Sequence, residues 1–174
     1  MNNGTIKGNQ APSGGGVYIE SGFSFMMNGG EIIENTANGD RDSWGGYFGG
    51  GGVCTEGTFT MNGGLISKNI ANGYVNKGGG GVFVPQFGTF VMNEGTISCN
   101  RTTKSGGGVC VHNSTFIKSN TAGIIYGGDA TEDKANKANQ YGNAVYTDNG
   151  SRDTTARATK ALDSRVQGAD GGWE

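Results

Sequence analysis

A short repeated block constrains the fold of this chain more than any other feature of its sequence. Four copies read MNNGTIKGNQA, MNGGEIIENTA, MNGGLISKNIA and MNEGTISCNRT, and a degenerate fifth copy, HNSTFIKSNTA, begins at His112. Aligned, the copies give one isoleucine column and two asparagine columns: Ile6, Ile32, Ile66, Ile97 and Ile117; Asn9, Asn35, Asn69, Asn100 and Asn120; Asn2, Asn28, Asn62, Asn93 and Asn113. Such a periodic pattern is typical of proteins built from stacked repeats.

A second block, GGGV and its variants, recurs between these copies. It aligns a column of valines, and a phenylalanine stands two residues before three of the repeated methionines: Val17, Val53, Val82, Val109 and Val145; Phe25, Phe59 and Phe90. Alternation within each segment predicts three short strands per repeat. A unit this small cannot bury its apolar side alone and must stack on its neighbours. We therefore predict an all-β, right-handed parallel β-helix of about five three-strand rungs, spaced by about 4.8 Å.

The repeat covers residues 1–150, which we predict to be one parallel β-helix module. Residues 151–174 lack the repeat, and we expect them to form a C-terminal cap or a linker. Met1 falls on the methionine column, so the chain begins within a rung, and its first residues lack the features of a signal peptide. We expect a module of a longer protein that carries its export signal upstream.

The composition argues against several classes of partner. Glycine accounts for 36 of 174 residues, but with only two prolines and no glycine at every third position the chain is not collagen-like. With 13 Lys and Arg against 15 Asp and Glu there is no basic surplus, so we expect no nucleic-acid partner. No apolar run approaches the ~18 residues of a membrane span, so we expect no membrane partner either.

The stacked glycine, asparagine and aliphatic columns resemble the right-handed parallel β-helix proteins of the pectate-lyase-like superfamily. Within it, the chain is most similar to β-helical xylan-binding modules of gut-bacterial glycoside hydrolases. The resemblance implies a secreted or cell-surface bacterial protein in which a polysaccharide-binding module is tethered to a catalytic domain. Lyases of the superfamily use clustered aspartates with calcium, and no strand of this sequence shows such a cluster.

Loop insertions suggest where a ligand would bind. They fall at residues 38–48, 72–77, 101–105 and 123–141, and we expect them to line up at one corner of the solenoid. They combine aromatic rings with polar groups: Trp44, Tyr47, Phe48, Tyr74, Tyr126 and Tyr141, with Asp40, Asp42, Arg101 and Asp129. Rings stack on the apolar face of a sugar, while polar groups bond its hydroxyls.

The leading hypothesis is a non-catalytic carbohydrate-binding module for an extended plant polysaccharide, xylan or another hemicellulose. It requires no cofactor, although Asp40 with Asp42, or Asp129 with Asp133, offers ligands for a structural calcium ion. One alternative is a structural or adhesin repeat segment of a bacterial surface protein. A second alternative is a polysaccharide-cleaving enzyme, because Glu20 and Glu56 fall on adjacent rungs, about 5 Å apart.

Three other features carry weaker predictions. The column beside the valines is expected to face outward and could form an aromatic platform: Tyr18, Cys54, Phe83, Cys110 and Tyr146. A second outward column, Ser24, Thr58 and Thr89, has the composition of an ice-binding face but is interrupted by Met26 and Val91. We expect free thiols at the three cysteines and a solvated side chain at His112.

Overall fold

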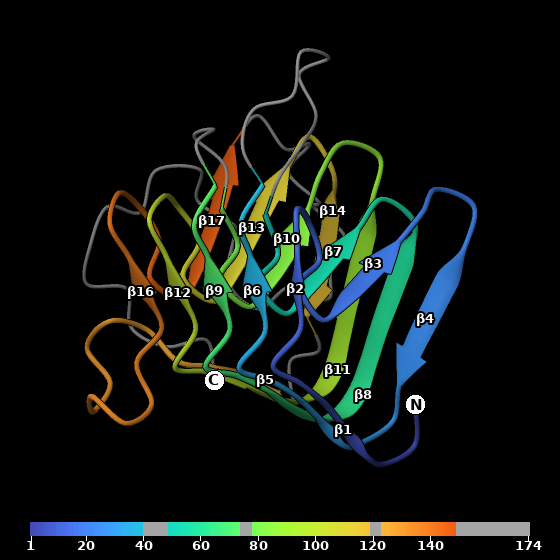
Figure 1. Cartoon of the computed structure of the whole chain (residues 1–174), viewed down its shortest axis with the longest axis horizontal. Helices are drawn as coiled ribbons and strands as arrows, with labels where there is room; N and C mark the ends of the chain where they lie inside the picture. Colours follow the sequence, from blue (N-terminus) through green and yellow to red (C-terminus); the bar gives the residue numbers. More distant parts are fainter. Residues whose placement is uncertain (40–48, 74–77, 119–122, 149–174) are drawn as a thin grey trace.

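The computed structural model describes residues 1–39, 49–73, 78–118 and 123–148. The 17 strands in these ranges form three parallel sheets, whose strands succeed one another in every rung (Figure 1). The chain is thus an all-β parallel β-helix of about five rungs, as the sequence predicts. Right-handed winding remains a prediction from the crossover rule.

Sheet A, with seven strands, contains the two longest strands of the described residues. Its members are β1 (Thr5–Lys7), β4 (Ser24–Met27), β5 (Glu31–Ile33), β8 (Thr58–Ser67), β11 (Thr89–Ser98), β14 (Thr115–Lys118) and β15 (Ile124–Ile125). β8 pairs with β4 along its first half and with β5 along its second, because β4 and β5, separated by residues 28–30, together match the length of β8. An irregularity in the pairing of β8 with β11 marks the junction of the two halves.

Sheets B and C have five strands each. Sheet B contains β2 (Gln10–Ala11), β6 (Thr36–Ala37), β9 (Ile70–Ala71), β12 (Arg101–Thr102) and β16 (Lys137–Ala138). Sheet C contains β3 (Val17–Ile19), β7 (Val53–Thr55), β10 (Val82–Val84), β13 (Val109–His112) and β17 (Val145–Asp148). We name the connections after the sheets they join: the A–B corner, the B–C corner and the C–A corner.

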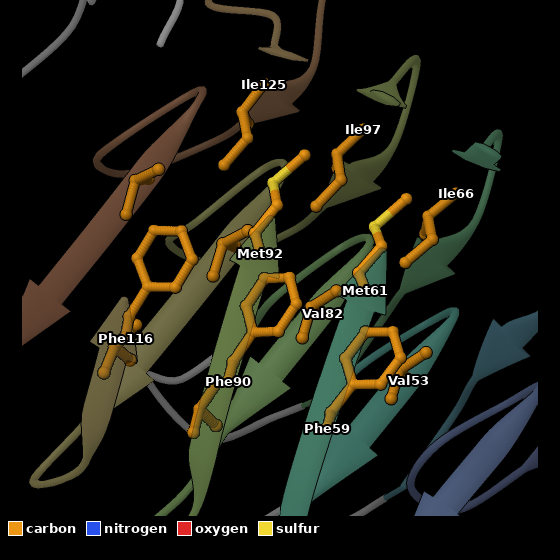
Figure 2. Close-up of a cluster of buried hydrophobic side chains, with 14 of the residues drawn as sticks. Val53, Phe59, Met61, Ile66, Val82, Phe90, Met92, Ile97, Phe116 and Ile125 are labelled. Carbon is orange, nitrogen blue, oxygen red and sulfur yellow. The ribbon is translucent and has the colours of Figure 1, made fainter. Parts of the chain in front are cut away.

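The core consists of columns of identical side chains, as the alignment predicts (Figure 2). Phe59, Phe90 and Phe116 are buried and stack with ring centroids 4.9 and 5.0 Å apart. Methionine, isoleucine and valine columns lie beside them, so a low total content of aliphatic residues still fills a continuous interior. Two columns are mixed: Lys118, only 2% exposed, pairs in register with Met92, and the buried column that begins with Ile19 continues through Thr55.

The fifth rung is built from other residues than the alignment predicts. Ile117 pairs with Val91 on the outer face of sheet A, and Ile125 continues the isoleucine column instead. Likewise the hydrogen bonds of the asparagine column that begins at Asn9 pass from Asn100 to Asn136, while Asn120 lies outside the described residues. The prediction was wrong here because extra residues before and after β15 delay both side chains in the sequence.

The prediction that all four loop insertions line up at one corner holds for only some of them. Residues 38–52, 72–81 and 103–108 all connect sheet B to sheet C. The segment 123–141, in contrast, contains β15 and β16, so its long loop at residues 126–136 lies at the A–B corner. Arg101 belongs to β12 itself. The four insertions therefore do not all join the same two sheets.

Candidate functional site

Most of the predicted ligand-binding residues cannot be located. Trp44, Tyr47, Phe48, Asp40 and Asp42 fall within 40–48, and Tyr74 falls within 74–77; both segments lie outside the described residues. Their roles stay predictions. The described flanks show only that both segments join sheet B to sheet C.

Tyr126, Asp129 and Arg101 are described, and none of them belongs to a connection between sheets B and C, although Gly128 of the same loop as Tyr126 lies against Asn143 in the β16–β17 connection. Tyr126 lies at the A–B corner, where its carbonyl oxygen accepts a hydrogen bond from Asn136 Nδ2 (2.7 Å) and Lys134 Nζ lies 5.7 Å from its ring centroid. Asp129 is exposed in the same loop, and Arg101 points outward from sheet B, paired in register with Ile70 and Lys137. The prediction that Tyr126 and Asp129 stand in a B–C insertion was wrong, while their position relative to Tyr74, which lies outside the described residues, stays a prediction.

One aromatic residue of the fourth insertion does lie at the B–C corner. Tyr141 stands in the short connection from β16 to β17 and is 42% exposed. Its ring stacks on that of Tyr146, with centroids 6.0 Å apart and planes inclined by 19°. A stacked pair with one accessible ring is a suitable platform for the apolar face of a sugar.

The outward column of sheet C is not an open platform, contrary to the prediction. Cys54, Phe83 and Cys110 are completely buried in a second hydrophobic cluster, against which Tyr146 packs. The B–C connections cover this cluster: a methyl group added at Gly49 would contact the Phe83 ring. Burial raises the pKa of the Cys54 thiol to about 12, with the charge of Glu56 adding to the effect and a hydrogen bond with Ser13 opposing it. All three cysteines are free thiols.

The acidic pair at the C–A corner has a well-defined partner. Glu56 Oε1 accepts a 2.6 Å hydrogen bond from the hydroxyl of Tyr18, one rung below, and Glu20 is exposed at the equivalent position of that rung. Partial burial and the carboxylate of Glu56 raise the pKa of Tyr18 above its ordinary value. His112 follows in the same column, pairs in register with Asp148 and is only 6% exposed, so the expectation of a solvated histidine was wrong.

One of the two predicted calcium sites, Asp129 with Asp133, lies among the described residues. Across the described residues, no three His, Cys, Asp or Glu side chains come together in a way that could hold a metal ion. Asp133 is fully exposed, and a hydrogen bond from the Thr131 side chain lowers the pKa of its carboxyl group. Calcium at Asp129 and Asp133 stays a prediction, while Asp40 and Asp42 lie outside the described residues.

Sequence reasoning missed two exposed phenylalanines at the C–A corner. Phe23 ends the turn at residues 20–23 and is 66% exposed; Phe87 lies in the turn at residues 85–88 and is 81% exposed. Phe87 has a φ of +70°, where an L-residue with a bulky side chain is strained by about 1–2 kcal/mol. The sequence signal is the length of the turns from sheet C to sheet A. They have four residues in rungs one and three (20–23 and 85–88) and two residues in rungs two and four (56–57 and 113–114).

Comparison with known proteins gives no further guidance. No protein-family model, no curated protein and no solved structure matches the chain. No helix in the described part of the chain is long and apolar enough to cross a membrane.

Proposed function

We propose that this chain is a non-catalytic module that binds a neutral plant polysaccharide, with xylan or another hemicellulose as the ligand class. The observation that carries the proposal is the accessible ring of Tyr141, stacked on Tyr146 at the B–C corner. Sheet B is joined to sheet C at this corner through 40–48 and 74–77, whose sequences supply Trp44, Tyr47, Phe48 and Tyr74. A row of such rings on a rigid solenoid suits an extended ligand.

The binding mode follows from general physical chemistry. Aromatic side chains stack on the C–H face of a pyranose, and nearby carboxylates and amides accept hydrogen bonds from its hydroxyl groups. A shallow surface gains little after the costs of ordering both partners, so the affinity is modest. As part of a secreted or cell-surface bacterial protein, the module would keep a tethered catalytic domain close to its substrate.

Affinity electrophoresis tests the proposal. Native gels carry xylan, mannan, β-glucan or no polysaccharide, and the full chain is compared with Trp44→Ala and Tyr141→Ala. We expect retardation of the wild type by at least one polymer and weaker retardation of both variants, with unchanged circular dichroism. Migration that no polymer retards would overturn the proposal and favour a structural or adhesin segment.

The enzyme hypothesis is tested on the same preparations. Glu20 and Glu56 would have to release reducing sugars or unsaturated products from the polysaccharide panel, and Glu56→Gln would abolish that release. We expect no product from the wild type, because Glu56 already binds the Tyr18 hydroxyl and the described residues around it include no Asp cluster.

A further inference from the structure

The C–A corner has a stepped shape that repeats every second rung. In rungs one and three the connecting turns have four residues and expose Phe23 and Phe87, whereas the turn between them consists of Glu56 and Gly57 alone. We call the surface formed by Phe23, Gly57 and Phe87 the C–A platform. Because the two phenylalanine turns are two rungs apart, they are separated by about 9.6 Å along the solenoid axis.

Backbone hydrogen bonds fix the three turns above one another. The amide of Thr58 donates to the carbonyl oxygen of Phe23 (2.9 Å), and the amide of Thr89 donates to that of Gly57 (2.8 Å). A methyl group added at Gly57 would collide with the carbonyl oxygens of Phe23 and Glu20. Only glycine therefore fits at position 57, so the turn between the two phenylalanine turns carries no side chain at that position.

Hydrogen-bond acceptors stand beside the rings. The carboxylate of Glu56 receives the Tyr18 hydroxyl on one oxygen and keeps capacity for further donors, because an ionised carboxylate has about four acceptor positions. Glu20 is exposed one rung below. Two carboxylates at the rim disfavour an acidic ligand and favour a neutral one that carries many hydroxyl groups.

The conformation of Phe87 is the second, independent observation. Ser24 and Thr89 both pair in register with Thr58. Phe87 stands two residues before Thr89, and Gly22 stands two residues before Ser24, so Phe87 occupies the turn position that Gly22 fills in rung one. Both residues have positive φ, +70° and +85°, but only glycine adopts it without strain. The strained Phe87 ring is 81% exposed, so burial does not compensate for the strain. Strain that packing does not explain is typical of binding positions.

The size of the surface limits what can occupy it. An aromatic side chain presents roughly 150–250 Å² at most, so the two exposed rings together offer a few hundred Å². A stable protein–protein interface buries about 800 Å² on each partner. A narrow ligand fits the C–A platform better than a second copy of the chain.

We infer that the C–A platform is a second polysaccharide-binding site, at which a neutral polysaccharide chain lies along the solenoid axis. One sugar ring stacks on Phe23 and another on Phe87, and hydroxyl groups donate to Glu20 and Glu56. This inference rests on the proposed function and adds a site that does not involve the B–C corner. Two sites on one solenoid would bind a long polymer more tightly than either site alone.

The test compares one variant of each site with a matched control. Phe87→Gly gives rung three the residue that rung one has at the same position, so it removes the ring without straining the turn. Tyr141→Ala alters the B–C corner, and Met26→Ala removes an exposed apolar side chain from the neighbouring face of sheet A. Full-length proteins are run in gels of xylan, mannan, β-glucan or polygalacturonate, the last being acidic, and their oligomeric state is measured by sedimentation.

We expect Phe87→Gly to weaken binding to the neutral polymer at least tenfold, and Met26→Ala to change it less than twofold. If the wild type is retarded but Phe87→Gly binds equally well, the second site is wrong and the proposed function stands. If no polymer retards the wild type, both proposals fail. A wild-type dimer that Phe87→Gly dissociates, without effect on retardation, would instead assign the platform to self-association and overturn the inference.

Discussion

The A–B and C–A corners join the same stack of rungs in opposite ways. At the A–B corner each of three successive rungs has a residue with positive φ followed by a buried asparagine: Glu34 and Asn35, Lys68 and Asn69, Cys99 and Asn100. At the C–A corner the turns have four, two, four and two residues, and no such column of side chains runs through them. The A–B corner is uniform over its first four turns, of two residues each, and differs only at the loop of residues 126–136, whereas the C–A corner varies from rung to rung.

The difference lies in how the backbone polar groups are satisfied. At the A–B corner, Asn69 Oδ1 accepts from the amide of Asn35 (2.9 Å), while its Nδ2 donates to the carbonyl of Ile32 (2.8 Å). At this corner an asparagine side chain satisfies backbone groups of the neighbouring rung, so every rung needs an asparagine at this position. At the C–A corner backbone-to-backbone bonds join the successive turns, and the one described bond from a side chain to a neighbouring rung's backbone, from Ser114 Oγ to the carbonyl oxygen of Val84 (2.7 Å), does not recur from turn to turn, so turn length and side chains are free to differ.

The largest expected effect comes from breaking the uniform corner. Asn69→Ala removes a buried amide that makes four hydrogen bonds, and leaves the Asn35 amide and the Ile32 carbonyl unsatisfied. We expect a loss of about 3 kcal/mol or more in the free energy of unfolding, measured by urea denaturation. Asn93→Ala is the control, because its amide bonds Asn62 (2.7 Å) in an exposed ladder; a loss above ~1 kcal/mol there would contradict our distinction.

The variable corner should be sensitive only where backbone geometry demands it. Gly22 has a φ of +85° and no heavy atom within 4 Å of the position that a Cβ would take. Gly22→Ala should therefore lower the free energy of unfolding by about 1–2 kcal/mol through backbone strain alone. Ser21→Ala, in the same exposed turn, should change it by less than ~0.5 kcal/mol. Equal effects of the two variants would show that strain does not decide stability at this turn.

At the matching position in rung three, replacing Phe87 by a residue that tolerates positive φ should stabilise the protein. Asn tolerates positive φ better than Phe does, so Phe87→Asn should raise the free energy of unfolding by about 0.5–1 kcal/mol. Thermal and urea unfolding would both report the gain. A clear loss of stability would mean that the Phe87 ring makes stabilising contacts despite its exposure.

The smallest expected effect is a change in titration at the C–A corner. The pKa of Tyr18 is raised above its ordinary value. Partial burial is the largest cause, followed by the hydrogen bond with Glu56 and the charge of Glu56. Since the folded-state pKa is the higher one, the stabilising contribution of Tyr18 is complete below the unfolded pKa and is lost as pH rises through the alkaline range. Glu56→Gln should lower the Tyr18 pKa without normalising it. Ultraviolet difference titration against Tyr18→Phe measures this shift, and an unchanged curve would contradict the role given to Glu56.

Most of the fold could be predicted from the sequence, because each core column recurs at the same place in its repeat. Ile32 with Ile66, and Val53 with Val82, pair as the alignment requires. The fifth rung could not be predicted in the same way, because its isoleucine and asparagine lie beyond inserted residues. Counting Thr-Phe pairs would have helped, since Thr115 and Phe116 continue the columns of Thr89 and Phe90.

The candidate site was predicted less well, for a physical reason. Residue composition suggested aromatic loops, and Tyr141 does lie at the predicted corner. Composition does not reveal which corner a loop occupies, so Tyr126 and Asp129 were assigned to the wrong one. The C–A platform depends on the relative lengths of turns in different rungs and on the φ of Phe87, and neither is visible in a single repeat.

The two asparagine ladders have opposite polarity. In the buried ladder the bonds between asparagine side chains run from each Nδ2 toward the C-terminal end of the solenoid, as from Asn35 to Asn69. In the exposed ladder each Nδ2 donates toward the N-terminal end, as from Asn62 to Asn28. The four repeats from Asn2 with Asn9 to Asn93 with Asn100 therefore each add two side-chain dipoles that point in opposite directions along the axis. A β-helix of this kind can gain rungs without these amides building up a dipole along its length.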